Sequence, residues 1–214
     1  DNYLLAVNKP AGIIVHADGT HEPSLTELVC EKLRALEGSR EIDLSQVQAL
    51  NRLDRETTGI VLFSLKKEMQ PQFDQLIASK ELSKEYLAAV KGAFEPHKLL
   101  IDKAIGKDRH DAQKMRVSAT GKPSQTEVCL VKVASSAQGQ IHSLLLVNLL
   151  TGRKHQIRVH LSSLGFPLVG DALYGGVSSL QRGAKRKHKA QPLMLHAYRV
   201  GFIHPVTSAK IVIK

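Results

Sequence analysis

An aspartate between two arginines is the first feature of this sequence that could do chemistry. Asp54 lies in the segment Asn51-Arg52-Leu53-Asp54-Arg55-Glu56-Thr57-Thr58-Gly59, directly before the apolar run Ile60–Phe63. Nearby guanidinium groups favour the ionised form of a carboxylate, which suits a nucleophile or an electrostatic stabiliser better than a general acid. A salt bridge that only holds a turn is the alternative interpretation of the same residues.

A second candidate segment runs from Thr151 to Leu161 and carries three cations, Arg153, Lys154 and Arg158. If the segment is helical, Lys154 and Arg158 share a face close to a helix N-terminus, which attracts anions. Arg153 and Arg158 then need either an acidic partner from elsewhere in the fold or a phosphate. A solvated basic helix face is the alternative.

A tyrosine, Tyr86, is the third candidate, because the chain has only four tyrosines. The β-rich segment Glu85–Lys91 places Tyr86 on one face of a strand with Ala88 and Val90. Taken alone, this pattern is typical of a core or edge aromatic side chain.

Charge is distributed very unevenly along the 214 residues, whose formal net charge is +10. Residues 1–127 have a net charge of −1, whereas residues 128–214 contain 12 Lys and Arg and a single acid, Asp171. Two basic segments, 106–122 and 175–191, are predicted as loops. The second contains the cations Arg182, Lys185, Arg186, Lys187 and Lys189. Such an asymmetry indicates a polyanionic partner, of which nucleic acid is the first choice.

Several classes of protein lack support in the sequence. There is no glycine-rich loop of the kind that binds dinucleotides or phosphates. Cys30 and Cys129 do not form a Cys-x-x-Cys pair, and the ten histidines are scattered along the chain. We therefore expect no metal, no cofactor and no disulfide. No apolar run is long enough for a membrane span and the start has no signal peptide, so a cytoplasmic protein is predicted.

The elements that must position these residues are short strands interleaved irregularly with helices. Ser24-Leu25-Thr26-Glu27 is a capping box that predicts a helix to about Leu36, closed by Gly38. Further helices are predicted around 72–79 and over 154–164, the latter with Thr151 as N-cap and Gly165 as its end. Strands are predicted at 4–7, 60–63, 85–91, 128–133, 143–149, 196–203 and 210–213. This order indicates an α+β fold with a mixed, largely antiparallel sheet flanked by helices and basic loops.

Together, these segments resemble the RluA-type pseudouridine synthases. That family's signature, His-Arg-Leu-Asp-Arg-x-Thr-Ser-Gly, is similar to residues 51–59, with Asn51 in place of the His and Thr58 in place of the Ser. Residues 151–160 are similar to the family's Thr-Gly-Arg-Thr-His-Gln-Ile-Arg-Val-His stretch. Further matches cover nearly the whole chain: Asn8-Lys9-Pro10-Ala11-Gly12, Lys84-x-Tyr86, Gly121-Lys122-Pro123, Gly170-Asp171, Tyr174-Gly175, Leu195-His196-Ala197 and His204-Pro205.

The resemblance implies a cofactor-free isomerisation of uridine in ribosomal or transfer RNA to pseudouridine. It assigns Asp54 as the essential carboxylate, Tyr86 as the tyrosine that packs on the base, and Arg158 as the arginine that pairs with the aspartate. By analogy, Arg52 helps to hold the target nucleotide out of its stack. The remaining candidates for substrate binding are Arg55, Arg153, Lys154, His155, Gln156, Leu195, Lys185, Arg186 and Lys187.

We expect one catalytic domain over residues 1–214, without a preceding N-terminal domain of the S4 type, and a monomer. One alternative is an RNA-binding or ribosome-assembly factor that keeps this fold without the chemistry. Another is an enzyme acting on a small molecule or free nucleoside, which would leave the basic C-terminal region unexplained.

Overall fold

The computed structural model describes residues 1–19, 22–36, 42–79, 81–136, 139–175 and 191–214. These residues form two compact units. Unit 1 comprises residues 1–84 and 197–214, and unit 2 comprises residues 85–196. The chain passes from one unit to the other within strand β4 (Ser83–Lys91) and again within strand β10 (Leu195–Ile203).

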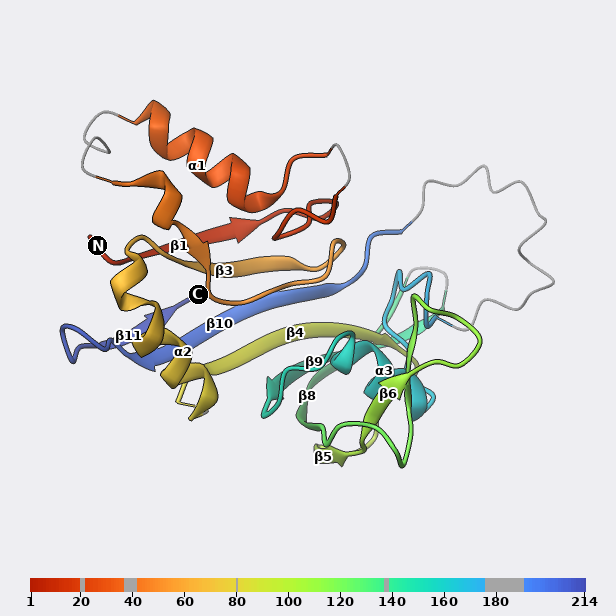
Figure 1. The fold of residues 1–214 in the computed structure, drawn as a ribbon. Helices are drawn as coiled ribbons and strands as arrows, with labels where there is room; N and C mark the ends of the chain where they lie inside the picture. Colours follow the sequence, from red (N-terminus) through yellow and green to blue (C-terminus); the bar gives the residue numbers. More distant parts are fainter. Residues whose placement is uncertain (20–21, 37–41, 80, 137–138, 176–190) are drawn as a thin grey trace. The chain divides into compact units, whose positions relative to one another are not determined.

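Unit 1 is built on the strand order β1–β3–β10 (Figure 1). Strand β1 (Leu4–Lys9) pairs antiparallel with β3 (Thr58–Ser64), from Leu4 opposite Ser64 to Lys9 opposite Gly59. The short β2 (Gln48–Ala49) also pairs with β3, and β11 (Lys210–Ile213) pairs with β10. Two 3-10 turns, η2 (Leu44–Gln46) and η3 (Lys67–Met69), connect these elements.

Strand β3 is buried on both faces, which explains its continuous apolar sequence. Val61 and Phe63 pack with helix α1 (Leu25–Ala35), whereas Ile60 and Leu62 pack with helix α2 (Gln70–Ala78). Figure 1 shows the two helices on opposite sides of these strands. The strand therefore gives the segment that precedes it, residues 51–57, a rigid support.

Helix α1 confirms the predicted capping box. Ser24 accepts a hydrogen bond from the amide of Glu27, and the Glu27 carboxylate accepts one from the amide of Ser24. These two bonds satisfy backbone donors that the first turn of a helix leaves without partners. Leu25, Val29 and Leu33 form the buried face, whereas Leu36, the C-cap residue, is 51% exposed. Gly38, the predicted end of the helix, lies outside the described residues.

Unit 2 contains the strand order β4–β9–β8–β5 and helix α3 (Gln156–Ser163). Beyond β4 its strands are β9 (Ile141–Leu149), β8 (Gln125–Ser135) and the edge strand β5 (Lys98–Asp102), joined in antiparallel pairs. As the alternation predicts, the side chains of Tyr86, Ala88 and Val90 are all buried. The α+β class with a largely antiparallel sheet is confirmed.

The segment 106–122 is not the loop that its charge indicated. It contains a hairpin of β6 (Ile105–Lys107) and β7 (Met115–Val117), and Lys122 returns to form backbone bonds to Ile105. Strands of three residues are too short to produce a recognisable alternation, which is why the sequence pattern missed them. The other predicted basic loop is described only at residues 175 and 191.

No helix within the described ranges is long and apolar enough to cross a membrane. That the whole of 1–214 acts as one catalytic domain remains a prediction.

Candidate functional site

The loop that carries Asp54 is fixed to strand β3 by its first residue, Asn51. The Asn51 amide donates to the carbonyl of Ile60 (3.2 Å) and its oxygen accepts from the amide of Leu62 (2.8 Å). At the other end, the amide of Thr57 donates to the carbonyl of Asp54 (3.1 Å), which closes a turn. The carboxylate of Asp54 thus belongs to a loop whose first residue is bonded to the core strand and whose last part forms a turn directly before that strand.

A buried lysine, Lys9, provides a further support that no pattern in the sequence predicted. Its ammonium donates to the carbonyls of Pro10 (2.9 Å), Ile13 (2.6 Å) and Arg55 (2.8 Å), and its side chain is fully buried. Burial lowers the pKa of Lys9 from 10.5 to about 8, although the charges of Glu56 and Asp54 oppose this shift.

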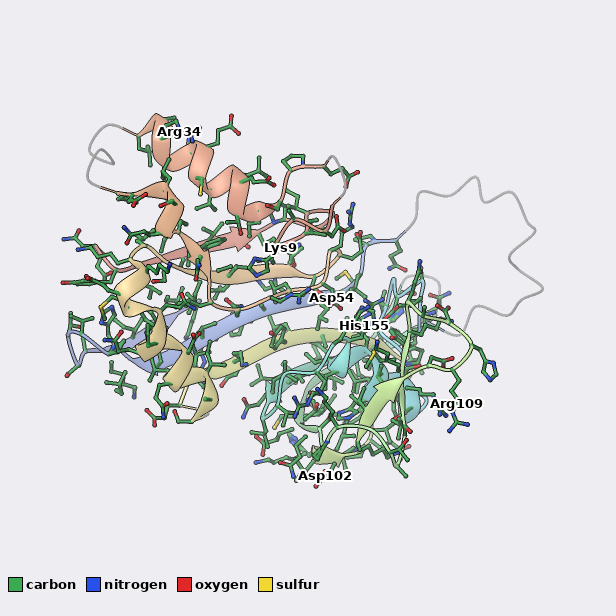
Figure 2. All side chains as sticks on the ribbon, viewed as in Figure 1. Lys9, Arg34, Asp54, Asp102, Arg109 and His155 are labelled. Carbon is green, nitrogen blue, oxygen red and sulfur yellow. The ribbon has the colours of Figure 1, made fainter. Side chains whose placement is uncertain are left out.

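Lys9 therefore ties the turn after β1 to the Asp54 loop (Figure 2). The only signal for it in the sequence was its place in the Asn8-Lys9-Pro10-Ala11-Gly12 match.

The two arginines beside Asp54 face different surroundings. The Arg55 guanidinium forms an ion pair with Glu22 at the surface. Arg52 is exposed. Partial burial, and then the charge of Arg52, lower the pKa of the His16 imidazole. Both cations remain predicted substrate contacts.

In unit 2, the guanidinium of Arg158 is held by Asp171. Its Nε and Nη2 donate to the two carboxylate oxygens, each at 2.9 Å, and the side chains are 10% and 0% exposed. Burial alone would raise the pKa of Asp171. The hydrogen bonds and charge of Arg158, with backbone amides of Leu173 and Tyr174, outweigh burial and hold that pKa below its usual value.

The acidic partner expected from elsewhere in the fold is therefore Asp171, the single acid of residues 128–214. The pairing of Arg158 with Asp54, implied by the resemblance, stays a prediction.

Tyr174 covers the same guanidinium. The centre of the Arg158 guanidinium lies 5.1 Å from the Tyr174 ring centroid. The Tyr174 hydroxyl is 2.8 Å from His155 Nδ1 and accepts a hydrogen bond from the Met115 amide, also at 2.8 Å. In the sequence, Tyr174 was only part of the Tyr174-Gly175 match to the family. In the structure it contacts both the start of the helix that carries Arg158 and the β6–β7 hairpin.

The helix itself begins later than predicted, and Thr151 is not its N-cap. His155 occupies that position with a φ of 56°, without a side-chain capping bond. The Thr151 hydroxyl instead donates to the side-chain oxygen of Gln156. Lys154 precedes the helix, so the expected helix face shared by Lys154 and Arg158 does not exist. The predicted end at Gly165 is confirmed by the C-cap Leu164 and a Gly165 φ of 86°.

Gln156 organises this turn from within. Its side-chain nitrogen donates to the Gln125 carbonyl and the Thr126 hydroxyl, and its oxygen also accepts from the Arg153 amide. Arg153 and Lys154 are consequently held at the surface, where both are exposed. Substrate contacts by His155 and Gln156 stay predictions, but both side chains already have partners inside the protein.

The remaining candidates divide into buried and undescribed residues. Tyr86 and Leu195 are 6% and 5% exposed. Lys185, Arg186 and Lys187 lie outside the described residues. Among the residues that are described, no group of three or more His, Cys, Asp or Glu side chains could hold a metal ion.

Known proteins similar to this chain point to a single family. Residues 3–163 match the family model described as RNA pseudouridylate synthase. An uncharacterised RNA pseudouridine synthase of Bacillus subtilis, YhcT, is 37% identical over 99% of the chain and 65% of its own length. The tRNA pseudouridine synthase C of Vibrio cholerae is 34% identical over 100% of the chain and 87% of its own length.

The ribosomal large subunit pseudouridine synthase C of Buchnera aphidicola is 35% identical, and the chain spans 64% of that protein. Among solved structures, human RNA pseudouridylate synthase domain containing 1 superimposes with a TM-score of 0.78 at 25% identity. That match covers 100% of this chain and 79% of the human one.

Proposed function

The chain belongs to the RNA pseudouridylate synthase family, and from this premise we propose that it isomerises specific uridines in RNA to pseudouridine. The observation that carries the proposal is the match over residues 3–163, which includes Asp54, Tyr86 and Arg158. Because the chain spans about two thirds of the Bacillus and Buchnera relatives, the activity, the substrate and the partners are all part of the proposal.

The reaction is an isomerisation, so the substrate and the product contain the same atoms. The bond between C1′ and N1 of the uridine breaks, the base rotates, and a bond forms between C1′ and C5. The proton on C5 is lost and N1 gains one. Asp54 attacks C1′, adds to the base, or removes the C2′ proton, and all three routes require its charged carboxylate.

Arg158 is proposed to pair with Asp54 and to keep its carboxylate charged. A guanidinium fixed by a bidentate carboxylate and an aromatic ring keeps one orientation, so little reorganisation accompanies the reaction. Arg158 is therefore proposed as a catalytic residue, with Asp171 and Tyr174 as the residues that position it.

Tyr86 and Leu195 provide the apolar part of the proposed site. Tyr86 packs on the uracil ring and assists loss of the C5 proton, and Leu195 forms part of the wall around the base. Since C1′ and C5 are hidden inside a base stack, the enzyme must extrude the nucleotide at a cost of a few kcal/mol. Arg52 is proposed to hold the extruded nucleotide.

Contacts with RNA phosphates offset this cost. The relatives named above are described as acting on transfer RNA and on the large ribosomal subunit, and we propose one of these two classes as the substrate. The cations Arg55, Arg153, Lys154, Lys185, Arg186 and Lys187 are proposed contacts. The protein is proposed to act in the cytoplasm as a monomer.

The proposal is tested by incubating the protein with unmodified transcripts of transfer RNA and of large-subunit ribosomal RNA. The RNA is then digested to nucleosides and separated by chromatography. Pseudouridine in either digest supports the proposal and selects the RNA class. RNA binding without pseudouridine in both would instead favour a binding factor that keeps the fold.

A further inference from the structure

The hydrogen bonds around Tyr174 determine where His155 carries its ring proton. His155 lies at the start of α3 (Figure 2), and its ring nitrogen Nδ1 is 2.8 Å from the Tyr174 hydroxyl oxygen. The backbone amide of Met115 donates to the same oxygen, also at 2.8 Å. A neutral imidazole has a proton on one of its two nitrogens, so one nitrogen donates and the other accepts. The direction of the bond between Tyr174 and His155 therefore fixes the proton of His155.

The chemistry of the two groups favours donation from Tyr174 to His155. A hydrogen bond is stronger when the more acidic group donates and the more basic atom accepts, which here are the phenol hydroxyl and the imidazole nitrogen. The Met115 amide already donates to the hydroxyl oxygen, and the Arg158 guanidinium lies 5.1 Å from the ring centroid. Both polarise the hydroxyl, which makes it a better donor and a poorer acceptor for a second N–H group. Nδ1 of His155 is thus the acceptor.

The charges in the sequence around His155 favour its neutral form. Lys154 precedes it, and Arg158 follows within the first turn of α3. The N-terminus of a helix also opposes a positive charge, because the macrodipole is positive there. Asp171, the single acid of residues 128–214, is engaged by Arg158 and by two backbone amides. A neutral His155 whose Nδ1 accepts must carry its ring proton on Nε2.

We propose that Tyr174 holds His155 as the neutral tautomer with its proton on Nε2, and that this N–H donates to an oxygen of the RNA substrate. The inference rests on the proposed function and gives His155, until now only a predicted contact, a defined donor atom. Tyr174 becomes a positioning residue for His155 as well as for Arg158. A neutral donor adds affinity for the RNA without the counterion release that accompanies a cation at a phosphate.

The first experiment observes the proton directly. The protein is labelled with ¹⁵N at histidine, and heteronuclear correlation spectra of the ring nitrogens at neutral pH distinguish the two neutral tautomers and the charged ring. The signals of His155 are assigned by their loss in His155→Gln. His160 is the internal reference, because its Nε2 lies 2.8 Å from the carbonyl of Lys103, which can only accept. Burial lowers the pKa of His160, which also keeps this ring neutral.

Wild-type His155 should give the same tautomer pattern as His160. Tyr174→Phe should shift His155 towards a mixture of tautomers and leave His160 unchanged. A wild-type His155 with its proton on Nδ1, or with both nitrogens protonated, would overturn the proposal. A His155 spectrum that Tyr174→Phe does not alter would overturn the positioning role of Tyr174.

The second experiment asks whether the Nε2–H group contacts RNA. Dissociation constants of a labelled, unmodified stem–loop transcript are measured for wild type, His155→Gln and His155→Leu between about 50 and 200 mM salt. The glutamine amide keeps an N–H donor, whereas leucine has none. Both replacements meet the same left-handed backbone, with a φ of 56° at residue 155, so the comparison between them isolates the donor. Circular dichroism checks that each variant is folded.

His155→Leu should weaken RNA binding about 2- to 10-fold, as expected for one hydrogen bond, and His155→Gln should stay within about 2-fold of wild type. All three proteins should share one slope of log K against log salt. Equal losses in both variants, no loss in His155→Leu, or a shallower slope in either would overturn the RNA contact while the enzyme function stood. A wild-type protein that binds no RNA would instead contradict the proposed function, and the tautomer spectra would distinguish the two failures.

Discussion

The guanidinium of Arg158 and the carboxylate of Asp171 form a buried bidentate ion pair, with both N–O distances at 2.9 Å. Asp171 also accepts hydrogen bonds from the amides of Leu173 and Tyr174, each at 2.9 Å. The pair uses Nε and Nη2 of Arg158 and fixes the plane of the guanidinium. The orientation of a proposed catalytic residue thus depends on a carboxylate for which the sequence patterns predicted no role.

Asp171→Asn should slow the chemical step without weakening RNA binding. The amide nitrogen would face a donor of Arg158, so the guanidinium would shift, and a displacement of about 1 Å costs on the order of 100-fold in rate. Single-turnover rates and RNA dissociation constants separate the two effects. Asp74→Asn, an exposed position on α2, is the control and should match wild type. A parallel loss of RNA affinity and rate would contradict the positioning role.

Acid stability should depend on the same carboxylate. The pKa of Asp171 is lower in the folded protein than its usual value, so its charge stabilises the fold above the unfolded pKa of about 4. That contribution is lost as the pH falls through the folded pKa. Chemical unfolding of wild type and Asp171→Asn between pH 7 and pH 3 checks this. The stability difference between them should shrink as the pH falls, and a constant difference would contradict the assignment.

Two variants of Tyr174 should separate its hydroxyl from its ring. Tyr174→Phe removes the bonds to Met115 and His155 but keeps the ring over Arg158, and should lower the free energy of unfolding by about 1 kcal/mol. Tyr174→Leu also removes the cation–π contact, which contributes about 0.5 to 2 kcal/mol. The leucine variant should therefore be the slower enzyme in single-turnover assays. Equal rates would show that the ring does not position Arg158.

Two glycines of unit 1 offer a matched comparison of backbone strain and steric clash. Gly59 has a φ of 109°, and a Cβ there would lie 2.3 Å from the carbonyl oxygen of Ala197. Gly12 has a φ of 88° with nothing within 4 Å of an added Cβ. Gly12→Ala should lower the free energy of unfolding by about 1 to 2 kcal/mol, because of the unfavourable backbone conformation alone. Gly59→Ala should cost more than about 4 kcal/mol, measured by urea unfolding, because β10 must move as well. Similar losses of unfolding free energy in the two variants would contradict the predicted clash between residue 59 and Ala197.

The parts of the fold that the sequence predicted are those with local causes. Helix α1 was recognisable because Ser24 and Glu27 cap it, and β3 because its residues are apolar on both faces. The β6–β7 hairpin depends on the distant return of Lys122 to Ile105, which leaves no periodic trace.

The candidate site shows the same division. The sequence predicted Asp54, Tyr86 and Arg158 as site residues through the family motif, but it did not predict which residues support them. Lys9 bonds to a carbonyl 46 residues away, and Thr151 was misread as an N-cap because its hydroxyl is used by Gln156. Such supports arise from tertiary contacts between residues whose individual types are unremarkable in the sequence.

The central claim is that this chain isomerises uridine in RNA and that Asp54 is essential to the reaction. The most direct measurement is the release of tritium from RNA labelled at C5 of uridine, for wild type and for Asp54→Ala, with RNA affinity measured alongside. We predict release by wild type, none by the variant, and nearly equal RNA affinity for both. Release by Asp54→Ala at the wild-type rate, or none by a wild-type protein that binds the RNA, would contradict the claim.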